Sequence, residues 1–257
     1  MEKRTVILNQ LSEKRADLVG YSRFLNNDKV SWEKTLASKI EQTNQLASNK
    51  HVLVINDTTE INYQHHINFL DKADKELGPA GNNTDIGFFV HPGLVIDVDH
   101  KIGIGFSYVK VWNRSWDKDD LKQSNRIART IEEKESYRWI ECGLKSKESL
   151  SSAKHITIIA DRESDLYEEF AMVPDQRTSL LIRSRIDRVL FDGGNVSTHL
   201  QSIPVCGNYT LKVKATKNRT GRDAIIEIKY TRVKIKRPEI KTINKKLPKY
   251  VEVYVVE

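Results

Sequence analysis

The sequence has little of what secreted, membrane-spanning and zinc-stapled proteins need. Only two cysteines occur in 257 residues, Cys142 and Cys206, and they give neither a disulfide framework nor a metal-binding spacing. The longest apolar runs, such as residues 52–55, are far too short to span a bilayer. No signal-peptide core follows Met1, and no repeat or low-complexity segment is present. We therefore expect a cytoplasmic protein without a membrane partner, and secreted, fibrous and zinc-finger classes are excluded.

What is present suits a folded protein of one large or two small domains. Hydrophobic residues make up 39% of the chain, enough for a core. The net charge of +7 is unevenly placed: residues 211–250 hold fourteen Lys or Arg against three acids, which is +11 and leaves −4 for the rest. Such a block is typical of phosphate contact, but its alternating pattern also fits strands with one solvated, charged face. The residues alone support both interpretations about equally, and the candidates for DNA binding are Lys212, Lys214, Arg232, Lys234 and Lys236.

Periodicity predicts a helical start followed by a mixed sheet. Helical spacing before a break at residues 26–28 precedes a second helix, for which Ser31 is the predicted cap. Buried or alternating runs then predict strands, with helices between the later ones. The first of these strands, residues 51–57, is predicted to be buried on both faces. The predicted strands are 51–57, 88–97, 102–112, 155–161 and 179–184, and the helices are 121–145 and a turn or two through Leu166 and Phe170.

Three antiparallel strands followed by alternating helix and strand match a ribonuclease H-like core, an α/β fold with a mixed sheet. We expect a partial N-terminal helical region over 1–48, the ribonuclease H-like core over 49–190, and a β-rich basic insertion over 191–257 that is cut short.

Two aspartates share one setting in this scheme. Asp57 and Asp161 each follow a buried strand and are the first acids after it. If the strands are neighbours, the two carboxylates meet at the edge where α/β sheets bind ligands. Mg²⁺ favours carboxylate oxygens together with water and phosphate, and paired ions can hold both oxygens of a phosphodiester displacement. The alternative is that each aspartate is an ordinary strand-end or capping residue.

The residues around the aspartates resemble bacterial DDE transposases of the insertion-sequence-four family, which cut and paste DNA through hairpin intermediates. Five segments in the family's order, over roughly residues 20–190, carry the resemblance: 21–27 (YSRFLNN), 57–63 (DTTEINY), 133–139 (EKESYRW), 161–168 (DRESDLYE) and 181–184 (LIRS).

The resemblance implies a set of roles. Asp57 and Asp161 would be the catalytic metal ligands for Mg²⁺, with Mn²⁺ able to substitute, and Arg183 would contact a phosphate near the scissile bond. Glu163 and Asp165 are expected on the first turn of the following helix, with an indirect role for Glu163 at the metal. The partner would be double-stranded DNA at transposon ends, bound by a homodimer in a synaptic complex in the bacterial nucleoid.

One family feature has no counterpart in the sequence. The family's third acid follows Tyr-x-x-Arg-x-x-x on a late helix, and no Tyr here has Arg three residues on. Glu257 ends a predicted strand and does not fit that helical pattern. We therefore expect a chain that is inactive alone. Two alternatives stay open: a non-catalytic DNA-binding or dimerising fragment that interferes with a full-length relative, and a nuclease using Glu60 or Glu163 as third ligand.

The histidines and tryptophans are weaker candidates for metal binding and base stacking. His65, His66, His91 and His100 lack metal-ligand spacing. Trp112 and Trp139 are expected to pack against the sheet, although tryptophans, Trp116 included, could stack on bases.

Overall fold

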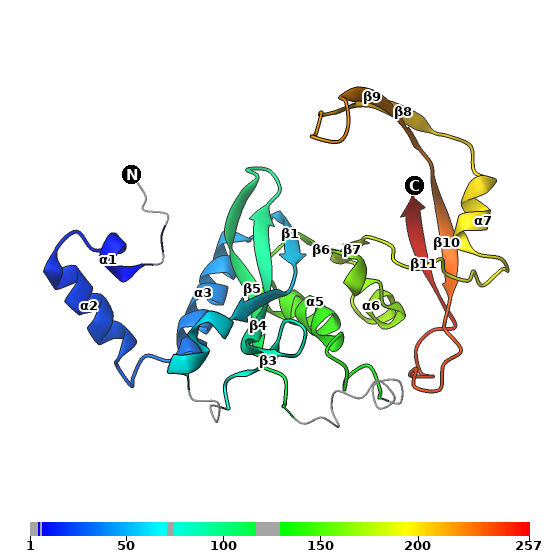
Figure 1. Cartoon of the computed structure of the whole chain (residues 1–257). Coiled ribbons are helices and arrows are strands. Elements are labelled where there is room, and N and C mark those ends of the chain that lie inside the picture. The colour runs from blue at the N-terminus through cyan, green and yellow to red at the C-terminus, as the bar shows by residue number, and fades with distance from the viewer. Residues whose placement is uncertain (1–4, 6, 71–74, 117–128) are drawn as a thin grey trace.

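The computed structural model describes residues 5, 7–70, 75–116 and 129–257 (Figure 1). The helical elements are α1 (Leu8–Leu11), α2 (Arg15–Leu25), α3 (Trp32–Leu46), η1 (Gln64–Phe69), α5 (Tyr137–Ser149), η2 (Arg162–Ser164), α6 (Tyr167–Met172) and α7 (Val196–Gln201). The strands are β1 (His51–Asn56), β2 (Thr59–Asn62), β3 (Gly78–Ala80), β4 (Asp85–Asp97), β5 (Ile102–Trp112), β6 (His155–Ala160), β7 (Thr178–Ile182), β8 (Gly207–Val213), β9 (Arg222–Ile228), β10 (Tyr230–Lys236) and β11 (Tyr250–Val256).

A seven-stranded mixed sheet forms the centre of the fold. Its main strands follow the order β5-β4-β1-β6-β7, in which β1, β6 and β7 are parallel and β4 is antiparallel to both β1 and β5. The short strands β2 and β3 pair with the first part of β4. This is the ribonuclease H-like order, and it confirms the predicted fold class. The 98–101 hairpin between β4 and β5 is also confirmed.

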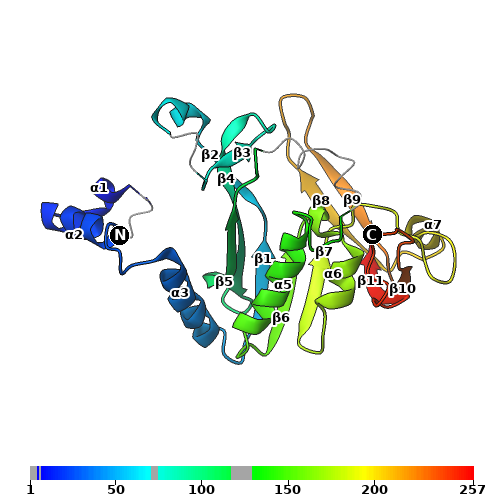
Figure 2. The ribbon, with the colours of Figure 1, turned by 90° about the horizontal axis from the view of Figure 1, so that it is seen from below.

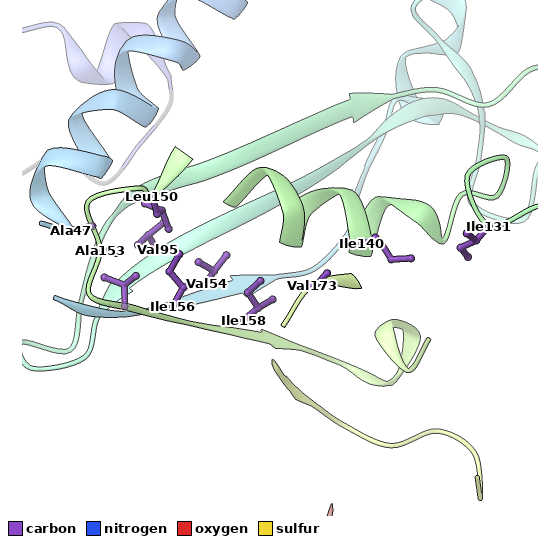
Figure 3. Close-up of a cluster of buried hydrophobic side chains, with 11 residues drawn as sticks. Ala47, Val54, Val95, Ile131, Ile140, Leu150, Ala153, Ile156, Ile158 and Val173 are labelled. Carbon is purple, nitrogen blue, oxygen red and sulfur yellow. The ribbon is translucent and has the colours of Figure 1, made fainter. Parts of the chain in front are cut away.

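One face of the sheet is covered by helices. Figure 2 shows α5 and α6 lying across the parallel strands. The core beneath them includes Val54 and Ile158 from the sheet and Ile140 from α5, all fully buried (Figure 3). Alternate residues of β1 and β6 enter this core because side chains in a strand alternate between faces.

The other face is largely open in the described part of the chain. Ile55, Leu94 and Leu181, from three different strands, are 37%, 36% and 59% exposed. The prediction that the first strand is buried on both faces is therefore wrong: its apolar run is continuous, but α5 and its neighbours shield only one side. Parallel strands are ordinarily covered on both faces.

The helices agree with the sequence in part. The Ser31 hydroxyl accepts a hydrogen bond from the backbone N–H of Lys34 (3.2 Å), so the predicted cap of α3 is confirmed. The predicted 121–145 helix is wrong over residues 129–136, because α5 begins only at Tyr137. Residues 129–136 form turns and bends instead, in which the backbone N–H of Thr130 donates to the Glu133 carboxylate (2.8 Å). The part of the prediction on 121–128 lies outside the described residues.

Two hairpins, β8–β9 and β10–β11, make up most of the chain after β7. The inner face of β10–β11 packs on α6 in a second core that includes Tyr167, Val233 and Val251. The region is β-rich as predicted, but α7 was not predicted. In Figure 1 the β8–β9 hairpin stands clear of the central sheet, with its turn directed back towards the side of that sheet.

Candidate active-site edge

Three predicted site residues occupy equivalent positions at the carboxyl ends of neighbouring strands. The parallel register pairs Ile55 of β1 with Ile159 of β6, so Asp57 and Asp161 each follow two residues later. The register of β6 with β7 pairs Ala160 with Ile182, which places Arg183 beside Asp161. All three side chains are exposed, and strand alternation assigns them to the face that the helices leave open. We call Asp57, Asp161 and Arg183 the strand-end cluster.

Each aspartate is held by a single local hydrogen bond. Oδ1 of Asp57 accepts from the backbone N–H of Thr58 (2.7 Å), and Oδ1 of Asp161 accepts from that of Glu163 (2.8 Å). Within the described chain neither carboxylate has an ion-pair partner, and neither Oδ2 atom accepts a hydrogen bond. Asp161 also caps η2, so the ordinary capping role is real and occupies one of its oxygens.

This donor set fits Mg²⁺ in part. Two carboxylate oxygens without partners face solvent, and Mg²⁺ usually takes one or two carboxylates while keeping several waters. The described residues contain no group of three or more His, Cys, Asp or Glu able to hold a metal ion. The edge can therefore supply two ligands, and water or phosphate would complete the shell.

Arg138 connects the loops that carry the two aspartates. Its Nε donates to Oγ1 of Thr58 (2.7 Å), and a terminal nitrogen donates to Oε2 of Glu163 (2.7 Å). Thr58 follows Asp57, and Glu163 lies two residues after Asp161. The guanidinium is largely buried, with 11% of the side chain exposed.

His91 lies behind Thr58 on β4. Its Nδ1 is 2.9 Å from Oγ1 of Thr58, and its ring meets that of Trp139 edge-on at 4.6 Å. Burial, followed by the charges of Arg138 and Lys110, lowers the pKa of His91 to about 3, so the ring is neutral near pH 7. His91 thus supports the edge as a packed, uncharged group.

The two acids after Asp161 differ from the prediction. Glu163 lies in η2, and Asp165 follows it, so neither is on the first turn of α6, which begins at Tyr167. Asp165 is buried and binds Arg188 through Oδ1 (2.6 and 2.8 Å). The buried Arg188 therefore ties Asp165, which lies between β6 and α6, to the loop after β7.

The candidate third ligands are already engaged. Glu60 accepts from the backbone N–H of Gly81 (2.7 Å) and from Asn62 (3.0 Å), on the side of β3. Glu163 pairs with Arg138. Glu257 lies 3.6 Å from Lys229 at the end of β11.

The predicted DNA-binding cations lie on exposed hairpin faces, and most face an acid. On β10, Val233 and Ile235 are buried while the basic residues point outward, as the alternation predicted. The pairs are Arg232 with Glu252, Lys234 with Asp192 (3.8 Å) and Lys236 with Glu239 (2.6 Å). On β8, Lys212 lies opposite Asp223, while Lys214, just after β8, has no acid partner among the described residues. DNA contact by these five residues stays a prediction.

The tryptophans pack as predicted. Trp139 is fully buried, and Trp112 stacks on Phe89 at 5.4 Å. Sequence reasoning missed Arg138 and Thr58. Both lie inside segments that resemble the transposase family, but no spacing in the sequence indicates that they meet across eighty residues.

No family model and no curated protein matches this chain. Among solved structures it is similar to the cryo-EM structure of a piggyBac transposase synaptic complex with hairpin DNA, at 10% identity and a TM-score of 0.38. The match covers 94% of this chain and 40% of that one, so the chain spans less than half of the transposase's length. A match this weak does not place the chain in the insertion-sequence-four family, which stays a prediction. In the described residues, no helix is long and apolar enough to cross a membrane.

Proposed function

We propose that this chain is a DDE-type transposase core of the insertion-sequence-four kind, acting on double-stranded DNA at transposon ends. The observation that carries the proposal is the strand-end cluster: two solvent-facing carboxylates and one arginine at matching positions on three parallel strands. Asp57 and Asp161 would hold Mg²⁺, and Arg183 would bind a DNA phosphate through its planar fork.

The reaction that this site would catalyse is phosphoryl transfer. Bound at the two carboxylates, Mg²⁺ would supply charge stabilisation and an activated water or hydroxyl. Asp57 and Asp161 would orient the ion through their free oxygens, while Arg183 would fix the phosphodiester beside them and neutralise charge on it. The side chain of Arg183 has no hydrogen-bond or ion-pair partner in the described chain, so it can reach a ligand.

We expect little or no cleavage by this chain alone. Among the described residues, the two carboxylates free to bind an ion at the edge are those of Asp57 and Asp161, because Glu60 and Glu163 are committed to other partners. A two-carboxylate set leaves a second ion poorly fixed, and phosphoryl transfer depends on such positioning.

The test is Mn²⁺ titration followed by electron paramagnetic resonance, with the matched pair Asp57→Asn and Asp99→Asn. Asp99 is an exposed aspartate on the 98–101 turn, away from the edge. We expect Asp57→Asn or Asp161→Asn to remove the bound Mn²⁺ signal and Asp99→Asn to keep it. Equal Mn²⁺ binding by wild type and the double variant Asp57→Asn/Asp161→Asn would refute the site. Cleavage of duplex DNA by the purified chain in Mn²⁺ would refute the predicted inactivity.

A second function is favoured by the basic hairpins. The chain could act as a non-catalytic DNA-binding or dimerising fragment that interferes with a full-length relative, since residues 211–250 carry +11. Duplex DNA binding that keeps its affinity in Asp57→Asn/Asp161→Asn but weakens steeply with salt would favour this function. A flat salt response would exclude it.

A further inference from the structure

Arg138 touches both aspartate loops through the residues that hold the aspartates. The backbone N–H of Thr58 binds Asp57, and the side chain of Thr58 binds Arg138. The backbone N–H of Glu163 binds Asp161, and the side chain of Glu163 binds Arg138. One guanidinium therefore completes a chain of hydrogen bonds from one carboxylate to the other.

We propose that Arg138 is a positioning residue that sets the separation and orientation of the Asp57 and Asp161 carboxylates for a divalent cation. This inference rests on the metal site of the proposed function and names a residue that acts through Thr58 and Glu163. Arg138 itself touches neither carboxylate.

The surroundings of Arg138 give it one orientation. A third nitrogen donates to the backbone carbonyl of Glu135 (3.0 Å), so all three guanidinium nitrogens have partners. The guanidinium carbon lies 5.2 Å from the ring of Trp139 and 5.8 Å from that of Trp112. Aromatic faces at this distance attract a guanidinium, and the helix start at Tyr137 fixes its stem.

Lysine cannot replace this geometry. An ammonium is a point charge on a flexible stem, whereas the arginine fork binds two acceptors in fixed directions. With Arg138→Lys, we expect contact with Glu163 to persist and contact with Thr58 to be lost. One aspartate loop would then be free to move relative to the other.

Arg114 supplies a matched control. It is also partly buried and binds Glu135 through a two-nitrogen fork (2.6 and 2.9 Å), but it contacts neither Thr58 nor Glu163. Arg114→Lys therefore removes a guanidinium fork from the same neighbourhood and leaves both aspartate loops in place.

The experiment measures Mn²⁺ affinity and, without metal, hydrogen exchange of the Thr58 and Glu163 amides in the full chain. Residues that orient metal ligands indirectly typically change affinity about 10–100-fold, so we expect Arg138→Lys to weaken Mn²⁺ binding by about that factor. Both amides should exchange faster in Arg138→Lys and stay as in wild type in Arg114→Lys.

The outcomes separate the two proposals. If wild type binds no Mn²⁺ at the edge while the two amides respond to Arg138→Lys alone, the metal site is wrong and the coupling of the loops by Arg138 stands. If Arg138→Lys leaves Mn²⁺ affinity and both amides unchanged, the positioning role is refuted. Equal effects of Arg114→Lys and Arg138→Lys would also refute it, because they would show general destabilisation.

Discussion

The carboxylates at the two ends of the central sheet differ in their hydrogen-bond and ion-pair partners. At one end, Asp97 closes β4 and accepts hydrogen bonds from Lys50 (2.8 Å), His100 (2.9 Å) and two backbone N–H groups. At the other end, Asp57 and Asp161 each accept one backbone hydrogen bond, and neither pairs with a cation from the described part of the chain. A carboxylate supplied with its own cations belongs to the fold, while one left without them is free to bind a cation from outside. The difference separates structural from candidate functional acids better than position at a strand end does.

The largest effect is expected from Asp97→Asn, which should lower the melting temperature several times more than Asp57→Asn. Asparagine removes the negative charge and one of the two acceptor oxygens, so Lys50 and His100 compete with two backbone N–H groups for the remaining oxygen. Because the Asp97 side chain is 1% exposed, water cannot supply the missing acceptor. Thermal unfolding of both variants measures the difference. Equal melting temperatures of the two variants would show that Asp97 stabilises the fold no more than Asp57 does.

Unfolding at low pH should also distinguish Asp97 from Asp57. The hydrogen bond from Lys50, followed by those from His100, holds the pKa of Asp97 below its ordinary value of 3.8. The stabilisation from this group is complete above about pH 3.8 and is lost as the pH falls further, because the proton then binds the unfolded chain more readily. Asp97→Asn should therefore flatten the acid limb of the stability curve, and Asp57→Asn should not.

Glu169 is a third kind of carboxylate: it is buried beside Ser164 and forms no ion pair with any residue that the structure describes. Burial raises its pKa to about 8, although Ser164 donates to it at 2.6 Å. Its contribution to stability is complete below the ordinary value of 4.5 and is lost as the pH rises towards 8, by up to about 1.4 kcal/mol per pH unit. Glu169→Gln should remove this slope in denaturant unfolding at several pH values. Glu168→Gln is the neighbouring control and should keep the slope.

Mg²⁺ should stabilise the fold through one end of the sheet only. At about a hundredfold excess over its dissociation constant, a ligand that binds the folded state alone adds about 2.7 kcal/mol. We expect this gain in wild type and in Asp97→Asn, measured from their own metal-free baselines, and no gain in Asp57→Asn/Asp161→Asn. A gain in the double variant would place the cation elsewhere.

The smallest expected effect concerns basic residues of the hairpins, some of which pair with an acid and some of which do not. If the hairpins bind DNA, Lys214→Gln should reduce the slope of log affinity against log salt by about 1, since each phosphate contact adds about that much. Arg232→Gln should change the slope less, because Glu252 already neutralises Arg232. Duplex binding at four or five salt concentrations measures both slopes, and equal changes would show that pairing with acids does not matter on this surface.

Much of the fold followed from local patterns, and the exceptions have physical causes. Ser31 marked its helix because a cap is a bond between residues three positions apart. The 129–136 turns and α7 were not predicted, because the spacing of apolar residues does not fix where a helix begins, and a helix as short as α7 depends on packing against other segments. The exposure of one face of the sheet was not predicted either. An apolar run such as that of β1 shows which residues are hydrophobic but not which segments cover them.

The sequence by itself determined which residues end the strands, and so made Asp57, Asp161 and Arg183 candidates for one site. The tertiary structure decided that their strands are neighbours in matching register, and that Asp165, Glu60 and Glu163 have other partners. It also brought Arg138 to Thr58 across eighty positions. Strand ends are set by short-range periodicity, whereas pairing register and the partner of a buried charge depend on packing between segments far apart in the chain.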